Sequence, residues 1–405
     1  MDDNVERARG YFAVAARGMQ PAGVRQSNMR AVSRVIARTP GVSNAEIARL
    51  TGLAPQTVSA VLTSLDDAGL LTRGPAQRRG GRGQPAIPIY LNAKGAFAIG
   101  IEIGWDGLDV ALVDMAGRVV ERLVRSHDYP DPGYILAELG RLMPSLLESP
   151  RSSERTRILG VGVAVPHELG QPNDQLPPPN GQANPWSSID IRLEVEQLTG
   201  LPTRLLSDGA AACWAEFLSR SRPLPANFAF LGVGTFVSAG FIADGRLWER
   251  GGAGSVAFGA MLVTDQAGTS RCVEDIASLR ALELRLHQSR TSLADILGDA
   301  PSEEAVHVLA DWTGGAGFAL AQAVLNTTTL LAVDVVVLGG PLPHPWLERL
   351  AEATEAELHR IGAHRQGLPR IGIGSLGRAA AAQGAGMLQI YRRYFSRELA
   401  DLDEE

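Results

Sequence analysis

The sequence predicts an N-terminal winged helix-turn-helix followed by a two-lobed α/β domain of the actin-like, ribonuclease H type. Three observations carry this prediction. Helix-periodic segments over residues 25–72 lead into a basic, glycine-rich loop. The surplus of basic residues is confined to this part of the chain. From residue 95 the pattern changes to short β-strand segments, a helix and a further apolar strand.

The first short helix has clear start and stop signals. Ser43 with Glu46 three residues later forms a capping box, which predicts a helix over Asn44–Leu50. Gly52 follows as a helix-ending residue. Pro55 then stands in the first turn of the next helix, where its missing N–H costs nothing. This order of two helices around a tight turn is typical of a helix-turn-helix.

The second helix presents two different faces. Val58, Val61, Leu62 and Leu65 recur at helical spacing and predict one buried stripe. The opposite face carries small and polar groups that can reach base edges in the major groove. The set of DNA-contacting residues predicted on the two helices is Ser43, Asn44, Gln56, Thr57, Ser59, Ala60 and Thr63.

A β-wing is predicted after the second helix. Gly69–Arg73 and Ala86–Leu91 have the pattern of two strands, and the segment AQRRGGRGQP joins them. Such a loop can lie against phosphates or place an arginine in a narrow A·T-rich minor groove. The wing residues predicted to contact DNA are Arg78, Arg79, Arg82 and Gln84.

Charge separates this module from the rest of the chain. Ten basic and three acidic residues lie between Val24 and Lys94, a balance of +7, whereas the whole chain has a net charge of −6. The remainder therefore sums to −13, which favours local phosphate binding over general adhesion to nucleic acid or to an anionic membrane. A packing or dimerisation domain with solvated arginines is the alternative, and helix spacing, wing and charge together favour DNA binding.

Length and cysteine content give the broad class. A chain of 405 residues is long enough for two or three domains. Its two cysteines, Cys213 and Cys272, cannot form a disulfide framework, which indicates a reducing cytoplasm. No long uncharged apolar run predicts a membrane span or a secretory signal. Residues 1–22 are expected to form an N-terminal arm.

The second module begins with the strand order of an actin-like lobe. Ala96–Ile103, Leu108–Asp114 and Val119–Arg125 are predicted strands, the helix Ile135–Leu147 follows, and Ile158–Val165 is a buried strand. The expected domains are a winged helix over 23–93, a first lobe over 94–205 with a C-terminal helix over 376–398, and a second lobe over 206–375 that serves oligomerisation.

Five motifs follow the predicted winged helix, in this order: IGIEIG, GVGVAVP, SDGAAA, LGVGTFVSAGFIADGRLWERGGAG and VVVLGG. With it they resemble the ROK family, which joins repressors of the xylose and N-acetylglucosamine kind with sugar kinases. The resemblance covers about residues 25–395 and is most specific over Leu231–Gly254. It implies a homodimer or homotetramer that places two winged helices on double-stranded operator DNA, with no membrane partner.

The phosphate-binding motifs of the family kinases are altered. The family pattern Asp-x-Gly-Gly-Thr falls on Glu102–Asp106, where Trp105 replaces the second glycine and Asp106 replaces the threonine. In the second phosphate loop Phe236 replaces a glycine. An indole blocks close approach of a phosphate to the backbone, and a carboxylate repels it. The comparison with the family therefore predicts no ATP cofactor and no enzyme activity.

The sugar-contacting positions are partly retained. The family's Asn-Asp pair falls on Ser207 and Asp208, and Asp208 matches the kinase base. A family glutamate and histidine are replaced by Ala257 and Ala260. A carbohydrate-type effector is expected to contact Ser207, Asp208, Glu274 and His167. The alternative for Asp208 is a structural one, a cap on the helix beginning at the next residue.

No metal site is expected. The positions that bind zinc in some family members are Ala260, Asp265, Ala267 and Cys272 here, and one thiol with one carboxylate does not make a closed tetrahedral site. Cys272 is instead expected to be a small buried residue.

These observations predict a DNA-binding transcriptional regulator, a repressor, that senses a carbohydrate or related metabolite without kinase activity. Two alternatives stay open. One is a sugar kinase with an appended DNA-binding domain, which Asp208 favours. The other is a regulator controlled by a partner protein or by no ligand, in which Asp208 and Glu274 have no sensing role.

Overall fold

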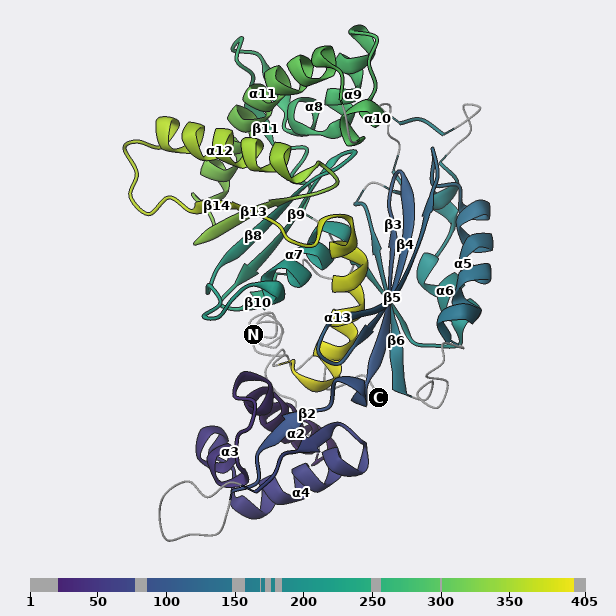
Figure 1. Cartoon of the computed structure of the whole chain (residues 1–405), viewed down its shortest axis with the longest axis vertical. Coiled ribbons are helices and arrows are strands. Elements are labelled where there is room, and N and C mark those ends of the chain that lie inside the picture. The colour runs from purple at the N-terminus through teal and green to yellow at the C-terminus, as the bar shows by residue number, and fades with distance from the viewer. Residues whose placement is uncertain are drawn as a thin grey trace, which may run out of the picture. The chain divides into compact units, whose positions relative to one another are not determined.

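The computed structural model describes residues 21–76, 86–147, 157–167, 169–171, 176–178, 184–248, 256–298 and 301–396. The chain divides into two compact units, one formed by residues 1–95 with 390–405 and the other by residues 96–389 (Figure 1). The expected N-terminal arm lies outside the described residues apart from its last two positions.

The first unit is a winged helix. Its helices are α2 (Pro21–Arg38), α3 (Asn44–Thr51) and α4 (Pro55–Asp67), followed by the antiparallel strands β1 (Leu71–Arg73) and β2 (Ile89–Leu91) and the short 3₁₀ helix η2 (Ala93–Gly95). The capping box of Ser43 and Glu46 is present, and Gly52 ends α3 in the left-handed conformation at φ 72°. The predicted stripe on α4 is buried, so the local signals defined these elements correctly.

The last helix of the chain ends in this first unit. α13 (Ala380–Tyr394) passes residue 390, from which the chain is grouped with the winged helix. Arg30 Nε donates to the carbonyl oxygen of Arg393 at 3.2 Å, and Arg34 Nη1 donates to those of Phe395 and Ser396 at 3.3 and 3.2 Å. Cationic side chains thus bind carbonyl groups in the last turn of α13 and in the two residues that follow it.

The second unit contains two five-stranded sheets of the same design. The first has the order β5-β4-β3-β6-β7, and the second has the order β10-β9-β8-β13-β14. In each sheet three strands are antiparallel and the last two run parallel to the central strand. The strands of the first sheet are β3 (Phe97–Ile103), β4 (Gly107–Asp114), β5 (Val119–Ser126), β6 (Ile158–Val165) and β7 (Thr203–Ser207). Those of the second are β8 (Phe228–Val233), β9 (Val237–Ala243), β10 (Arg246–Leu247), β13 (Val335–Gly339) and β14 (Arg370–Ile373). This duplicated topology confirms the predicted two-lobed α/β fold.

Helices cover the sheets on both sides, as Figure 1 shows. Two helices lie on the outer face of the first sheet, α5 (Pro132–Leu147) and α6 (Ile191–Thr199). The short 3₁₀ helix η5 (Pro185–Ser188) precedes α6. α7 (Asp208–Ser219) and α13 lie between the two sheets, with η6 (Gly377–Ala379) before α13. The second lobe is completed by α8 (Glu274–Ala277), α9 (Leu279–Gln288), α10 (Leu293–Leu297), α11 (Glu303–Thr327), α12 (His344–Ile361) and the hairpin β11 (Leu262–Thr264) and β12 (Ser270–Cys272).

Among the described residues, α11 is the helix that is long and apolar enough to cross a membrane by length and composition. Its Leu309, Trp312 and Leu320 have no exposed surface and belong to the core of the second lobe. Burial inside the lobe accounts for its apolar character.

Close backbone packing holds α13 against its neighbours within the second unit. A Cβ atom on Gly100 of β3 would overlap the carbonyl oxygen of Ala382 in α13. A Cβ on Gly384 of α13 would likewise overlap the carbonyl oxygen of Ala211 in α7. The Ala- and Gly-rich composition of α13 is therefore what its position between β3 and α7 requires.

Candidate DNA-binding surface and ligand cleft

The outer face of α4 carries the side chains predicted to reach bases. Gln56, Ser59, Ala60 and Thr63 are exposed, whereas Thr57 is partly buried. The helix makes its buried contacts with the opposite face. An exposed polar face on the second helix of a helix-turn-helix is the arrangement that enters a major groove.

Two of the predicted residues at the start of α3 also have structural roles. Ser43 Oγ donates to Glu46 Oε2 at 2.8 Å and accepts from the Glu46 N–H at 3.4 Å. Asn44 Nδ2 donates to Ser59 Oγ at 3.1 Å, which connects α3 to α4. Ser43 is thus occupied by the helix cap, and Asn44 helps to fix the outer face of α4.

The wing is described only at its base. The predicted residues Arg78, Arg79, Arg82 and Gln84 lie outside the described residues. At the base, Arg73 Nε of β1 donates to Asp66 Oδ2 of α4 at 2.9 Å. This ion pair joins the first wing strand to the end of α4.

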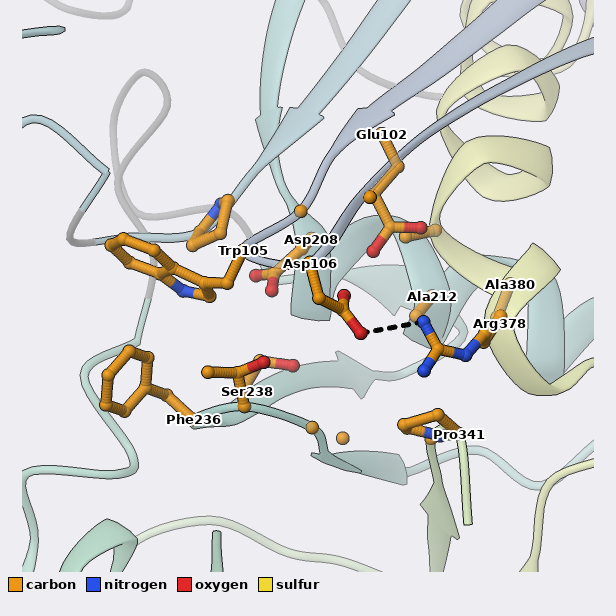
Figure 2. A pocket seen from close by; sticks show the side chains of 18 of the residues that line it. Glu102, Trp105, Asp106, Asp208, Ala212, Phe236, Ser238, Pro341, Arg378 and Ala380 are labelled. Carbon is orange, nitrogen blue, oxygen red and sulfur yellow. Dashed lines mark hydrogen bonds and ion pairs between the residues drawn. The ribbon is translucent and has the colours of Figure 1, made fainter. Parts of the chain in front are cut away.

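The second unit holds a cavity of about 160 Å³. The segments that meet around it include the turn between β3 and β4, the turn between β8 and β9, the start of α7 and the segment that begins α13 (Figure 2). Strand positions and turns therefore bring together residues that are far apart in the sequence. Its polar, charged and aromatic lining residues include Glu102, Trp105, Asp106, Asp109, Arg122, His167, Asp208, Thr235, Phe236, Ser238 and Arg378.

An aromatic pair closes one side of the cavity. Trp105 and Phe236 pack edge to face, with ring centroids 5.3 Å apart and planes inclined at 79°. Each of the two residues is only 8% exposed. Trp105 belongs to the first lobe and Phe236 to the second. Each occupies a position where the family kinases have a glycine in a phosphate-binding loop. The rings therefore occupy the space beside both turns, and their geometry is the favourable one for aromatic pairs.

Two arginines neutralise two of the carboxylates in the lining. Arg122 Nε donates to both oxygens of Asp109, at 3.1 and 2.9 Å, and Asp109 is 6% exposed. Arg378 Nη1 donates to Asp106 Oδ2 at 2.8 Å, the contact drawn in Figure 2. Neither pair was predicted, because Arg378 lies 272 positions from Asp106 and no local pattern connects them.

Glu102, near the end of β3, has a carboxyl group with a raised pKa. Burial raises its pKa to about 8, and the charges of Asp208, Asp109 and Asp106 act in the same direction against the opposing charge of Arg378. At neutral pH its carboxyl group is mostly protonated and can donate a hydrogen bond. From the sequence, Glu102 is recognisable only as part of the altered phosphate turn, because its protonation depends on neighbours from other elements.

The cleft brings together only part of the predicted sugar-binding set. Asp208, the first residue of α7, lines the cavity, and its Oδ1 accepts the N–H of Gly209 at 2.7 Å. Ser207 is buried and caps α7 by accepting the N–H of Ala210 at 3.1 Å. The alternative in which Asp208 is the cap is therefore wrong, because Ser207 precedes the first helical turn and takes that position.

The other two predicted ligand residues lie differently. His167 is exposed and lines the cavity after β6. Glu274 begins α8 and contacts the position of Gly259, where an added Cβ would overlap its Oε2, but it is not among the lining residues. Gly259 itself lines the cavity, so Glu274 lies directly behind the wall.

The described part of the chain contains no group of three or more His, Cys, Asp or Glu side chains that could hold a metal ion. This includes the described positions that match the zinc-binding positions of some family members. Cys272 is partly exposed, so the expectation that it is buried is wrong. It belongs to the short edge hairpin of β11 and β12, which leaves one side of the strand open to solvent.

Comparisons with known proteins agree with this architecture. The model of the ROK family matches residues 98–391, and that of the MarR family matches residues 34–83. A xylose repressor of Bacillus subtilis (strain 168) is 22% identical over 385 residues, covering 91% of this chain and 96% of the repressor. An N-acetylmannosamine kinase of Vibrio cholerae serotype O1 is 32% identical over 176 residues, 40% of this chain and 58% of the kinase.

Among solved structures, a ROK family transcriptional regulator that is a homologue of the Escherichia coli MLC protein aligns with a TM-score of 0.67 and 20% identity, covering 94% of this chain and 99% of that one. The alignment therefore includes both units. With the ROK match over more than half of its length and a MarR-type helix-turn-helix before it, this chain belongs to the ROK family.

Proposed function

We propose that this chain is a DNA-binding transcriptional repressor that responds to a carbohydrate or related metabolite and has no kinase activity. One observation carries the proposal. A helix-turn-helix with an exposed polar face precedes a kinase-like cleft in which Trp105 and Phe236 pack together beside the two phosphate turns. The xylose repressor of Bacillus subtilis aligns with 91% of the chain, which includes both parts.

The cleft is poorly suited to phosphoryl transfer. That reaction depends on positioning and on groups that stabilise the charge of the transferred phosphoryl. Here Trp105 takes the place of a glycine, and the carboxylate of Asp106 faces the same space. Arg378, a cation that lines the cavity, is bound to Asp106 of that turn. A triphosphate would therefore meet steric overlap and like charge.

The same cleft suits a sensor. A small polar molecule between the lobes would contact Asp208 and His167, which line the cavity. If it bound one lobe arrangement better than the other, it would shift their populations, and only that difference in affinity could alter operator binding. We place the protein in the cytoplasm as a homodimer or homotetramer on double-stranded operator DNA, in line with the symmetry of palindromic sites.

A sugar kinase with an appended DNA-binding domain is the second candidate. Asp208 lines the cavity at the position that matches the family's kinase base, and a kinase is among the relatives. An ADP-release assay over a panel of monosaccharides separates the two. The repressor proposal predicts no sugar-dependent ADP release, and turnover with any sugar would overturn that part of it.

Retardation of DNA from the region upstream of the gene tests the regulatory function. The proposed repressor binds this DNA with a Kd of about 10⁻⁸ M or lower at physiological salt, far more tightly than an unrelated duplex, and one carbohydrate of the panel weakens the complex. Absence of binding to any promoter fragment would contradict DNA-binding function. Tight binding that no carbohydrate alters would favour control by a partner protein or by no ligand.

A further inference from the structure

We propose that α4 reads A·T base pairs, with the amide of Gln56 as the base-specific contact and the methyl groups of Ala60 and Thr63 as apolar contacts. The proposal rests on the proposed DNA-binding function and adds the class of operator sequence. It concerns α4 and its immediate neighbours, which the structure describes completely.

The three residues form one line along the exposed face of α4. Gln56, Ala60 and Thr63 follow one another at i, i+4 and i+7, and all three are exposed. Gln56 is the second residue of the helix. Base edges are contacted by the N-terminal residues of a recognition helix, so Gln56 has the position from which a side chain enters the groove.

Gln56 differs from the serines and from Thr63 of α4 because their hydroxyl groups already take part in hydrogen bonds within the first unit. Thr63 Oγ1 donates to the carbonyl oxygen of Ser59 at 3.0 Å, and Ser64 Oγ donates to that of Ala60 at 3.1 Å. Asn44 Nδ2 donates to Ser59 Oγ. Within the described residues no hydrogen bond occupies the Gln56 amide. It therefore offers a donor and an acceptor together, which is the pair that matches N7 and N6–H₂ of adenine.

The other two residues on this line contribute methyl groups. Ala60 presents only its methyl group, and the hydroxyl hydrogen of Thr63 is already used inside the helix, so Thr63 offers its methyl group beside an oxygen that can only accept. Alanine and threonine methyl groups pack against the C5-methyl of thymine. The same face thus offers one amide for adenine and two methyl groups for thymine.

The side chains that discriminate most strongly for guanine and for cytosine are missing from this face. Guanine is read by arginine or lysine, and Pro55–Asp67 contains neither. Cytosine is read by a carboxylate, and the two carboxylates of α4 stand at its C-terminal end, where Asp66 is bound to Arg73. Arg49, an exposed cation on α3, suits contact with a phosphate, which carries no base information.

The test uses the full-length protein and selection from a library of random duplexes, followed by fluorescence anisotropy at fixed salt. The wild type is expected to select an A·T pair at the position facing Gln56 in each half-site. Replacing that pair by G·C weakens binding by about 5- to 150-fold. Gln56→Ala removes this discrimination, and Gln56→Arg transfers the preference to G·C.

Two control variants separate base reading from other effects. Ser64→Ala, on the same helix, keeps the wild-type preference because its hydroxyl is used within the helix. Arg49→Ala weakens binding to all duplexes alike and reduces the salt dependence by about one phosphate contact. Gln56 is exposed, so its variants should keep the wild-type melting temperature, which circular dichroism checks.

Selection of G·C at the facing position by the wild type would overturn the inference. So would a Gln56→Ala protein that binds and retains the A·T preference. If the wild type binds no duplex at all, the proposed function itself fails, and the inference fails with it. These outcomes are distinct, because the first two are read only from proteins that bind DNA.

Discussion

A single carboxyl group shows how the cleft changes the chemistry of its residues. Burial and three neighbouring aspartates raise the pKa of Glu102 from an ordinary value of 4.5 to about 8. Between these values the folded protein binds more protons than the unfolded chain, so this group makes stability fall as pH rises through that window. Below pH 4.5 the carboxyl is protonated in both states and has no such effect.

We therefore expect Glu102→Gln to flatten the pH dependence of stability. The amide has the same shape and cannot ionise, so the charge that the cleft disfavours never forms. The melting temperature of the wild type should fall more between pH 5.5 and 8.5 than that of the variant. Parallel melting curves for the two proteins across this range would show that Glu102 does not titrate as described.

A second residue-scale prediction concerns the aromatic pair. Trp105 and Phe236 should be energetically coupled, because edge-to-face packing contributes about 0.5–1.5 kcal/mol beyond the burial of area. Trp105→Ala, Phe236→Ala and the double variant, compared by denaturant unfolding, form a double-mutant cycle. A coupling energy near zero would mean that the two rings are independent neighbours and do not hold the turns together.

At the scale of elements, glycine sets the distance between α13 and the first sheet. Gly100→Ala would place a methyl group against the carbonyl oxygen of Ala382, with backbone on both sides and little room to relax. The expected cost is about 1–3 kcal/mol of unfolding free energy. Gly23→Ala in α2 is the matched control, since no atom lies within 4 Å of its added Cβ.

The control should be neutral or stabilising by up to about 1 kcal/mol, because alanine favours a helix over glycine. Denaturant unfolding of both variants measures the difference. Equal stability of Gly100→Ala and Gly23→Ala would mean that α13 can move away from β3 without loss, contrary to the close packing described.

The elements that the sequence predicted well are those with local signals. The capping box at Ser43, the stop at Gly52 and the buried stripe from Val58 fixed α3 and α4 within a residue or two. Alternating and apolar runs likewise predicted β3, β4, β5 and β6 of the first sheet. Such signals act over one or two turns or strands, so the sequence alone expresses them.

The parts of the site that could not be predicted depend on distant neighbours. Arg378 meets Asp106 only because η6 is brought to the β3–β4 turn by the fold. Ser207 rather than Asp208 caps α7, a choice between adjacent residues that depends on where β7 ends. Glu274 matches a family contact, yet Gly259 stands between it and the cavity. A motif match identifies which residue occupies a family position. Whether that residue lines the cavity depends on its place in the tertiary structure.

At the scale of the whole molecule, the winged helix is the proposed DNA-reading unit, and the cleft has the two phosphate turns of the fold with Trp105 and Phe236 in place of glycines. Asp208 should then matter for sensing and not for DNA affinity. We expect Asp208→Ala to bind operator DNA as the wild type does but to lose its response to the effector. Asp311→Ala, an exposed carboxylate on α11 outside the cavity, is the matched control and should keep the response.

One measurement tests the central claim most directly. Fluorescence anisotropy of DNA from the upstream region is followed with purified protein at fixed salt, with and without mono- and disaccharides and sugar phosphates, because affinity changes steeply with ionic strength. The account predicts tight binding that one carbohydrate alters and that stays responsive in Asp311→Ala but not in Asp208→Ala. DNA binding that is absent, or that remains the same with every carbohydrate, would contradict a sugar-sensing repressor.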